Sequence, residues 1–255
     1  LPNLPPGMVE HFRRQGGAST TYCVDETSLL ADLDRRLSTE LSSALLLEAR
    51  IHEFRPFYPR VAFDYGLSIT SDDIYLLLKN HCDALAGIFI AENQIEPWLR
   101  TTRPVFSSRF VLVSLAEKGY GRLEDIPRGR PIGVRLGGQA DMAFGTFQRA
   151  RQQSDRWLRL QYNENQLLLE RVLDGTLEAA LIWEPALRPL LDAAGVPSDA
   201  VRVIDPGAFS PPRVDYVFAV LAEDSFLLSM LDQGIEVLQE NGTLDALLAE
   251  LELGR

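Results

Sequence analysis

The apolar positions along this chain of 255 residues switch between strand-like runs and helical spacings. Residues 20–24 (TTYCV) form a run typical of a strand, and from 30 to 44 apolar residues, mainly leucines, recur at the spacing of one helix face. Further strands are expected at 50–54 and 84–90, with a helix between them that Ser71 would cap. This order of strands and helices predicts an α/β fold with a mostly parallel sheet.

The pattern restarts after a strand at 110–114 and the polar segment 117–130 (EKGYGRLEDIPRGR), which is expected to be a surface connection. Strands are predicted at 132–135, 179–183, 201–204 and 216–221. Helices are predicted at 140–152 and 166–173, the first after the turn Gly137-Gly138. Two amphipathic helices end the chain, the last of them capped by Thr243.

The length allows two domains of ordinary size, each with its own core. We expect an N-terminal extension at 1–19, a first lobe made of 20–113 and 222–255, and a second lobe at 114–221. Hinges are expected near Ser114 and Asp215.

Composition and charge narrow the function classes. The chain is 46% hydrophobic and 24% charged, as in globular proteins. Its net charge of -11, without a basic stripe, argues against nucleic acid and anionic membranes as partners. No apolar run reaches the roughly 18 residues that span a bilayer. The opening LPNLPPG is interpreted as the start of a mature chain whose signal peptide has been removed.

The residue content of the chain gives little support to a catalytic function. Nucleophilic catalysis needs a base beside the nucleophile, and the histidines are only His11, His52 and His81. His81 precedes Cys82, but neighbours in a strand point to opposite faces. Cys23 and Cys82 fit no zinc site, so they are either a disulfide, which would imply export, or two free thiols. We expect a protein that is not an enzyme, without cofactor or metal.

Candidate ligand-binding residues follow the predicted strands. Gly137 and Gly138 leave a strand and enter a helix, which exposes backbone N–H groups, although a simple turn explains them equally well. Acids follow two other predicted strands, namely Asp25 with Glu26 and Glu184, and ligands of open α/β sheets bind at such strand ends. The alternatives are that Asp25 only caps the next helix and that Trp183 only packs in the core. If these acids face a cleft, they favour a cation, a neutral solute or a protein over an anion. The candidates are Asp25, Glu26, Glu92, Ser107, Gly137, Gly138, Gln139, Trp183 and Glu184.

The run from Tyr22 to Leu251 resembles the type II periplasmic solute-binding proteins of ABC importers, in the amino-acid-binding branch. The segments that carry the resemblance are YCVDE, NHCDALAGI, TTRPVFSSRFVLV, LEDIPRGRPIGV, VLDGTLEAALIWEP and ENGTLDALLAEL, in this order. The resemblance implies two α/β lobes joined by crossover strands, with a ligand cleft between them. It also implies a periplasmic protein that gives a small solute to an ABC permease.

A narrower resemblance is to the J proteins encoded with methanol dehydrogenases. It rests on Cys23, Cys82, the TTRP segment, and Trp183 with Pro185. It implies a periplasmic accessory protein whose partner is a quinoprotein alcohol dehydrogenase that depends on pyrroloquinoline quinone. This is the main functional prediction, and an ABC substrate-binding protein is the alternative.

The sequence departs from both groups. Amino-acid binders usually carry an arginine just after AGI, where this chain reads IAENQIE and has its first basic residue at Arg100. The J proteins continue the first strand with a proline-rich loop, where this chain reads ETSLLAD. A regulator's effector-binding domain of the same fold is disfavoured, because no helix-turn-helix precedes it and the charge is acidic.

Overall fold

The computed structural model describes residues 19–28, 30–55, 70–90 and 96–250. The chain divides into two compact units. Of the described residues, those up to 107 and those at 215–250 form unit 1, and residues 108–214 form unit 2. The chain enters unit 2 within β5 (Phe106–Leu115) and leaves it within β10 (Arg213–Leu221).

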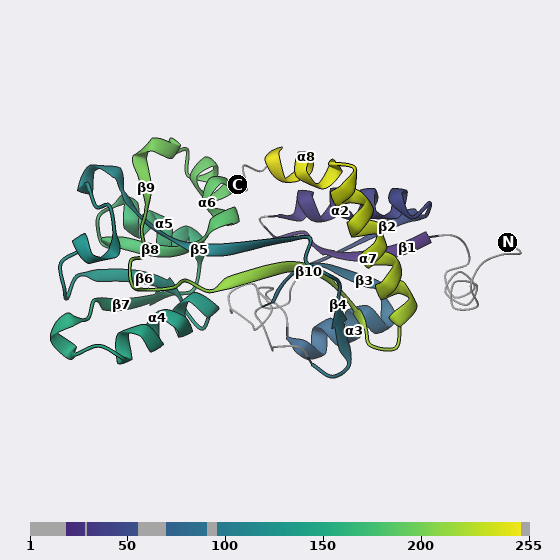
Figure 1. Cartoon of the computed structure of the whole chain (residues 1–255), viewed down its shortest axis with the longest axis horizontal. Coiled ribbons are helices and arrows are strands. Elements are labelled where there is room, and N and C mark those ends of the chain that lie inside the picture. Colours follow the sequence, from purple (N-terminus) through teal and green to yellow (C-terminus); the bar gives the residue numbers. More distant parts are fainter. Residues whose placement is uncertain (1–18, 29, 56–69, 91–95, 251–255) are drawn as a thin grey trace, which may run out of the picture. The chain divides into compact units, whose positions relative to one another are not determined.

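The sheet of unit 1 is mixed. β1 (Ser19–Asp25) lies parallel to β2 (Glu48–Phe54) and β3 (Ala84–Ile90), while β10 runs antiparallel to β3 and to the short β4 (Leu99–Thr101). Figure 1 shows α2 and α7 on one side of these strands and α3 on the other. The helices of this unit are α2 (Ala31–Ala44), α3 (Ser71–Asn80), α7 (Ser225–Glu240) and α8 (Thr243–Glu250).

Unit 2 repeats the arrangement. β6 (Pro131–Arg135) lies parallel to β7 (Leu158–Tyr162) and β8 (Ala179–Trp183), and β5 runs antiparallel to β8 and to β9 (Val201–Ile204). One core lies under α4 (Gln139–Arg149), and the other lies under α5 (Asn165–Leu173) and α6 (Glu184–Ala193). These helices cover opposite sides of the strands in Figure 1. Four short 3-10 helices are found at Ala116–Lys118, Leu123–Asp125, Gln153–Asp155 and Ser198–Ala200.

Most predicted elements are present, and β3, β8 and β9 have the predicted bounds. β4, β7 and α6 were not predicted. β7 is a five-residue edge strand whose sequence LRLQY alternates apolar and polar positions, so its strand signal was present and was not recognised. α6 carries Pro185 in its first turn, where proline is tolerated, and a second proline at 189.

Three local predictions at helix ends are wrong. Thr70, not Ser71, caps α3, since its hydroxyl accepts the N–H of Asp73 at 3.2 Å and the Asp73 carboxylate accepts the Thr70 N–H. Thr243 is the first residue of α8 and gives its N–H to the Asn241 side chain at 2.9 Å. The helix predicted at 140–152 is α4, which ends at Arg149.

His81 does not lie in a strand, as the sequence analysis assumed, but is the C-cap of α3. Its ring stacks on His52, with centroids 4.8 Å apart. His11 lies outside the described residues.

The segment 117–130 is not a purely surface connection. Leu123 and Ile126 are fully buried in the core beneath α4. Lys118 and Arg130 reach the buried Glu178 carboxylate at 3.1 and 2.7 Å, and the Tyr120 hydroxyl donates to it at 3.1 Å. The segment is therefore fixed to β8 by apolar packing and by charge.

Cys23 and Cys82 form a disulfide with a Cα–Cα distance of 5.6 Å. Both cysteines are buried in the core between the sheet and α3, where Ile74, Leu85 and Val217 surround them. Of the two alternatives left by the sequence, the structure thus shows the bridge. It links β1 to the end of α3 across a sequence separation of 59 residues.

Removing the disulfide should destabilise the protein. For the double variant C23S/C82S we expect the free energy of unfolding to fall by about 4 kcal/mol, because a closed loop of this length restricts the unfolded chain. Urea unfolding of the oxidised protein and of the variant measures the difference. A loss below about 1 kcal/mol would contradict the expectation.

Glu178 should make stability depend on pH. Burial by itself raises the pKa of Glu178, but the bonds from Lys118, Tyr120 and Arg130 outweigh it and lower that pKa below its ordinary value. Stability from this group is therefore complete above the unfolded-state pKa and is lost as the pH falls through the folded-state value. We expect E178Q to lose about 2 kcal/mol at pH 7 in urea unfolding, and less below pH 4. The control is E117Q, which also removes one negative charge but breaks no ion pair or hydrogen bond of the described structure.

Candidate functional site

In unit 2 the parallel arrangement of β6, β7 and β8 brings their carboxyl ends to one edge of the sheet. Ligands of open α/β sheets bind at such edges, because the following helices begin there. Two groups of predicted residues meet at this edge. Gly137, Gly138 and Gln139 follow β6, and Trp183 and Glu184 stand where β8 ends and α6 begins.

The turn before α4 leaves the start of that helix without a side-chain cap. Gly137 has φ +70°, a left-handed conformation that favours glycine, and its N–H donates to Asp141 Oδ2 at 3.1 Å. Gly138 occupies the N-cap position and has no side-chain oxygen to accept the helix N–H groups. The first N–H groups of α4 can therefore serve an anionic or carbonyl ligand.

Arg135, the last residue of β6, was not predicted as a site residue. It is partly buried, and burial lowers the pKa of its guanidinium. Its Nε is shielded from solvent without a hydrogen-bond partner, and within the described ranges no carboxylate pairs with it. Gln139 Oε1 is likewise buried and unpartnered. A charged residue that ends an apolar strand before two glycines was the signal available in the sequence.

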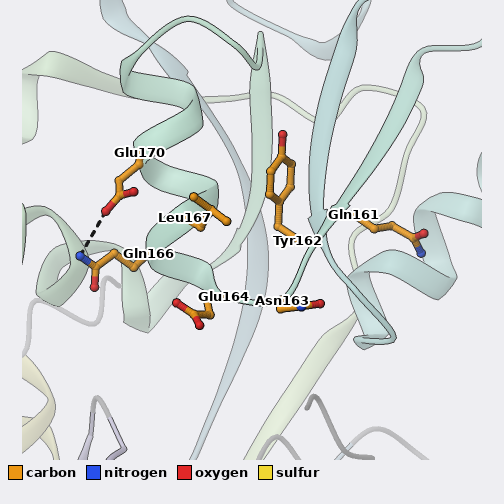
Figure 2. A pocket seen from close by; sticks show the side chains of 7 residues that line it. All are labelled: Gln161, Tyr162, Asn163, Glu164, Gln166, Leu167 and Glu170. Atoms are coloured by element: carbon orange, nitrogen blue, oxygen red, sulfur yellow. Dashed lines mark hydrogen bonds between the residues drawn. The ribbon is translucent and has the colours of Figure 1, made fainter. Parts of the chain in front are cut away.

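A cavity of about 540 Å³ opens at the end of β7. Figure 2 shows Tyr162 on one side of the view and Leu167, Gln166 and Glu170 of α5 on the other, with Gln166 hydrogen-bonded to Glu170. Tyr162 is the direct strand partner of Arg135, so the cavity and Arg135 are associated with neighbouring strand ends. The cavity is lined by Gln161, Tyr162, Asn163, Glu164, Gln166, Leu167 and Glu170.

The cavity wall is connected to the turn before α4. Gln161 Nε2 donates to Asp141 Oδ2 at 2.6 Å, and the same oxygen accepts the N–H of Gly137. Arg159 pairs with the other carboxylate oxygen of Asp141 at 3.3 Å. Asp141 therefore holds β7 and the turn in one hydrogen-bonded arrangement.

Trp183 and Glu184 have partners on β5. Trp183 Nε1 donates to Ser108 Oγ at 2.6 Å, and Glu184 pairs with Arg109 at 3.4 Å. Trp183 is only partly buried. Both residues are thus positioned at the edge, and the charge of Glu184 is matched by an arginine.

In unit 1, Asp25 and Glu26 follow β1 as predicted. Asp25 is 4% exposed and accepts the N–H and the hydroxyl of Thr27 at 2.8 and 2.6 Å. It shapes the loop before α2 and does not cap that helix, whose N-cap is Leu30. Burial raises the pKa of Asp25 although the Thr27 bonds oppose this. Glu26 forms an ion pair with Arg55.

Ser107 also belongs to unit 1, where its hydroxyl donates to Asp215 at 2.6 Å. Glu92 lies outside the described residues. The expectation that acids would disfavour an anion assumed that they face a cleft, and it stays a prediction. Asp25, Glu26 and Glu184 are each engaged, the last two with arginines.

A buried carboxyl group was also missed. Asp34 of α2 is 1% exposed, and Tyr216 of β10 donates its hydroxyl to Asp34 Oδ1. Burial raises the pKa of Asp34 well above its ordinary value, and the charge of Asp25 adds to the effect. A Cβ on Gly87 would come within 2.8 Å of Asp34 Oδ2, so glycine makes room for the carboxyl.

Within the part of the chain that the structure describes, no three His, Cys, Asp or Glu residues are grouped as a metal site. None of the helices in these ranges is long and apolar enough to cross a membrane.

No protein-family model and no curated protein matches the chain. Solved structures do. The second substrate-binding domain of GlnP from Lactococcus lactis, in an open conformation, has a TM-score of 0.67 at 14% identity, covering 92% of this chain and 95% of that one. An ancestral cationic amino acid solute-binding protein, AncCDT-1, has a TM-score of 0.66 at 16% identity and 96% and 98% coverage.

A third similar structure is the amino acid ABC transporter substrate-binding protein AbpA from Streptococcus pneumoniae, bound to L-arginine. Its TM-score is 0.60 at 13% identity, with 95% of this chain and 97% of that one covered. These neighbours are solute-binding proteins and not enzymes. At such identities they establish the fold alone, which is the α/β, two-lobed type II periplasmic binding fold. The predicted fold class is therefore confirmed.

Asp34 generates a prediction about stability. A carboxyl group with a raised pKa in the folded state holds its proton more tightly than in the unfolded chain. Stability therefore falls as the pH rises above the unfolded-state pKa of about 3.9. We expect D34N, which can still accept the Tyr216 hydroxyl, to be more stable than the native protein at pH 7. Urea unfolding from pH 3 to pH 8 measures this, and the advantage should vanish near pH 3. An equal loss at every pH would contradict it.

Proposed function

We propose that this chain is the substrate-binding protein of an ABC importer and captures a small solute at the carboxyl edge of unit 2. The observation that carries the proposal is the uncapped start of α4 behind Gly137 and Gly138, in a chain with this fold. The free N–H groups and the positive end of the helix dipole suit a carboxylate, phosphate or carbonyl oxygen. The cavity beside Tyr162 provides room for further atoms of the solute.

The Cys23–Cys82 disulfide supports a periplasmic location, because such bridges persist in oxidising compartments. The permease would be the protein partner of the closed, solute-bound form. Hinges near Ser114 and Asp215 remain part of the proposal, as does a ligand contact from Ser107.

The accessory role with a quinoprotein alcohol dehydrogenase stays a prediction from the narrower resemblance. The cysteine pair and the missing arginine after AGI are the features that favour it. None of the three similar structures described above is named as such an accessory protein, so the transport function is placed first.

A thermal-shift screen of the oxidised protein separates the two functions. Amino acids, polyamines, alcohols and pyrroloquinoline quinone are tested, with capture of a purified quinoprotein dehydrogenase in parallel. A solute that raises the Tm by several degrees supports transport, since a ligand at 100 times its Kd adds about 2.7 kcal/mol. Capture of the dehydrogenase without any stabilising solute would support the accessory role.

The role of the α4 start in solute binding can be tested by removing one backbone N–H group. Proline is tolerated at the first position of a helix, so Q139P removes one N–H donor while keeping the helix. Q139A is the matched control, because it removes the side chain and keeps the N–H. For a solute found in the screen, we expect titration calorimetry to show roughly tenfold weaker binding by Q139P than by Q139A, about one hydrogen bond. Equal affinities would remove this helix start from the site.

A further inference from the structure

We propose that Arg135 binds the oxyanion of the solute, so that the anion-binding arginine of this protein lies in unit 2 at the end of β6. The inference rests on the proposed function and adds to it the charge of the ligand group and the residue that recognises it. A planar guanidinium can give two parallel hydrogen bonds to a carboxylate or a phosphate.

The first argument is the absence of a structural partner. A guanidinium withdrawn from water is unfavourable unless it is paired, and Arg135 has its Nε shielded and unpartnered. Other arginines of unit 2 have evident roles. Arg130 and Arg159 pair with Glu178 and Asp141, and Arg128 lies 3.8 Å above the centroid of the Trp157 ring.

The second argument is position. Side chains alternate along β6, and Gly133 faces Leu168 and Leu177 on the α5 side, so Arg135 leaves the sheet on that same side. Tyr162, its strand partner, lines the cavity there. A Cβ on Gly138 would come within 3.9 Å of the Arg135 Cβ. Arg135 is thus the strand neighbour of a residue that lines the cavity, and its Cβ lies near the N-cap position of α4.

The net charge of the segment also permits an anion. Residues 108–214 contain 14 Lys and Arg against 13 Asp and Glu, so the excess of acid in the chain lies outside this segment. Glu184, the predicted acid at this edge, is paired with Arg109, whereas Glu164 and Glu170 line the cavity itself. The charge that attracts an anion must therefore come from Arg135 and not from the cavity wall.

The experiment compares R135M with R151M by thermal unfolding of the whole oxidised chain at pH 7.5. Methionine keeps an apolar stem and removes the charge. Arg151 is the matched control, because its Nε is also buried without a partner but its guanidinium stacks over Phe147 at 4.4 Å. The added probes are propionate and inorganic phosphate, with propionamide as the neutral analogue, all at one ionic strength set with sodium chloride.

We expect R135M without probe to melt at least about 2 °C above the native protein, because an unpaired charge is gone. R151M should melt lower. Propionate or phosphate should raise the Tm of the native protein and of R151M but not that of R135M, and propionamide should have no effect. R135K should respond more weakly than the native protein. A lower Tm for R135M, or an equal anion response in R135M, would overturn the inference.

The outcome is separable from that of the proposed function. An uncharged solute that stabilises the native protein and R135M equally would leave the transport function in place and remove Arg135 from it. Anion binding that depends on Arg135, together with no stabilising organic solute in the screen, would keep the inference and contradict the transport function.

Discussion

Parallel strands impose the constraint on which the rest of unit 2 depends. When β6, β7 and β8 run in one direction, the helices that follow them must begin at a single edge, with their unpaired N–H groups and positive dipole ends close together. The side chains near each helix start then determine whether its N–H groups are capped. Asp141 satisfies the turn at Gly137, but no side chain caps α4. The N–H groups at the start of α4 consequently have no side-chain acceptor from the N-cap residue.

Three ionisable groups that are buried or partly buried have different surroundings. Glu178 stays ionised because two cations and a phenol surround it, and this fixes the segment 117–130 to β8. Asp34 has only the Tyr216 hydroxyl beside it, so burial favours its protonated form. Within the described residues, the partly buried Arg135 has no counter-charge, and its Nε has no hydrogen-bond partner. Of the three groups, it is the one that the fold leaves without a partner.

The sequence predicted the fold well because long apolar runs report burial directly. β3 (ALAGIFI) and β8 (AALIW) are such runs, and their bounds were predicted correctly, as were those of the shorter β9 (VRVI). β7 (LRLQY) also alternates apolar and polar residues, so its signal was in the sequence and the prediction overlooked it. The site was partly predictable. Glycines after a strand point to a helix start, but the pairing of Glu184 with Arg109 and the orphaned Nε of Arg135 depend on residues that only folding brings together or hides.

Stability and function meet at this edge. A partly buried guanidinium whose Nε has no partner costs free energy, and functional sites are where proteins tolerate such costs. The ion cluster at Glu178 shows the alternative in the same unit, where two cations compensate a buried carboxylate. Of the acids predicted at strand ends, Glu26 and Glu184 are each paired with an arginine, and Asp25 accepts hydrogen bonds from Thr27. Their presence in the sequence therefore does not by itself indicate a free negative charge at a strand end.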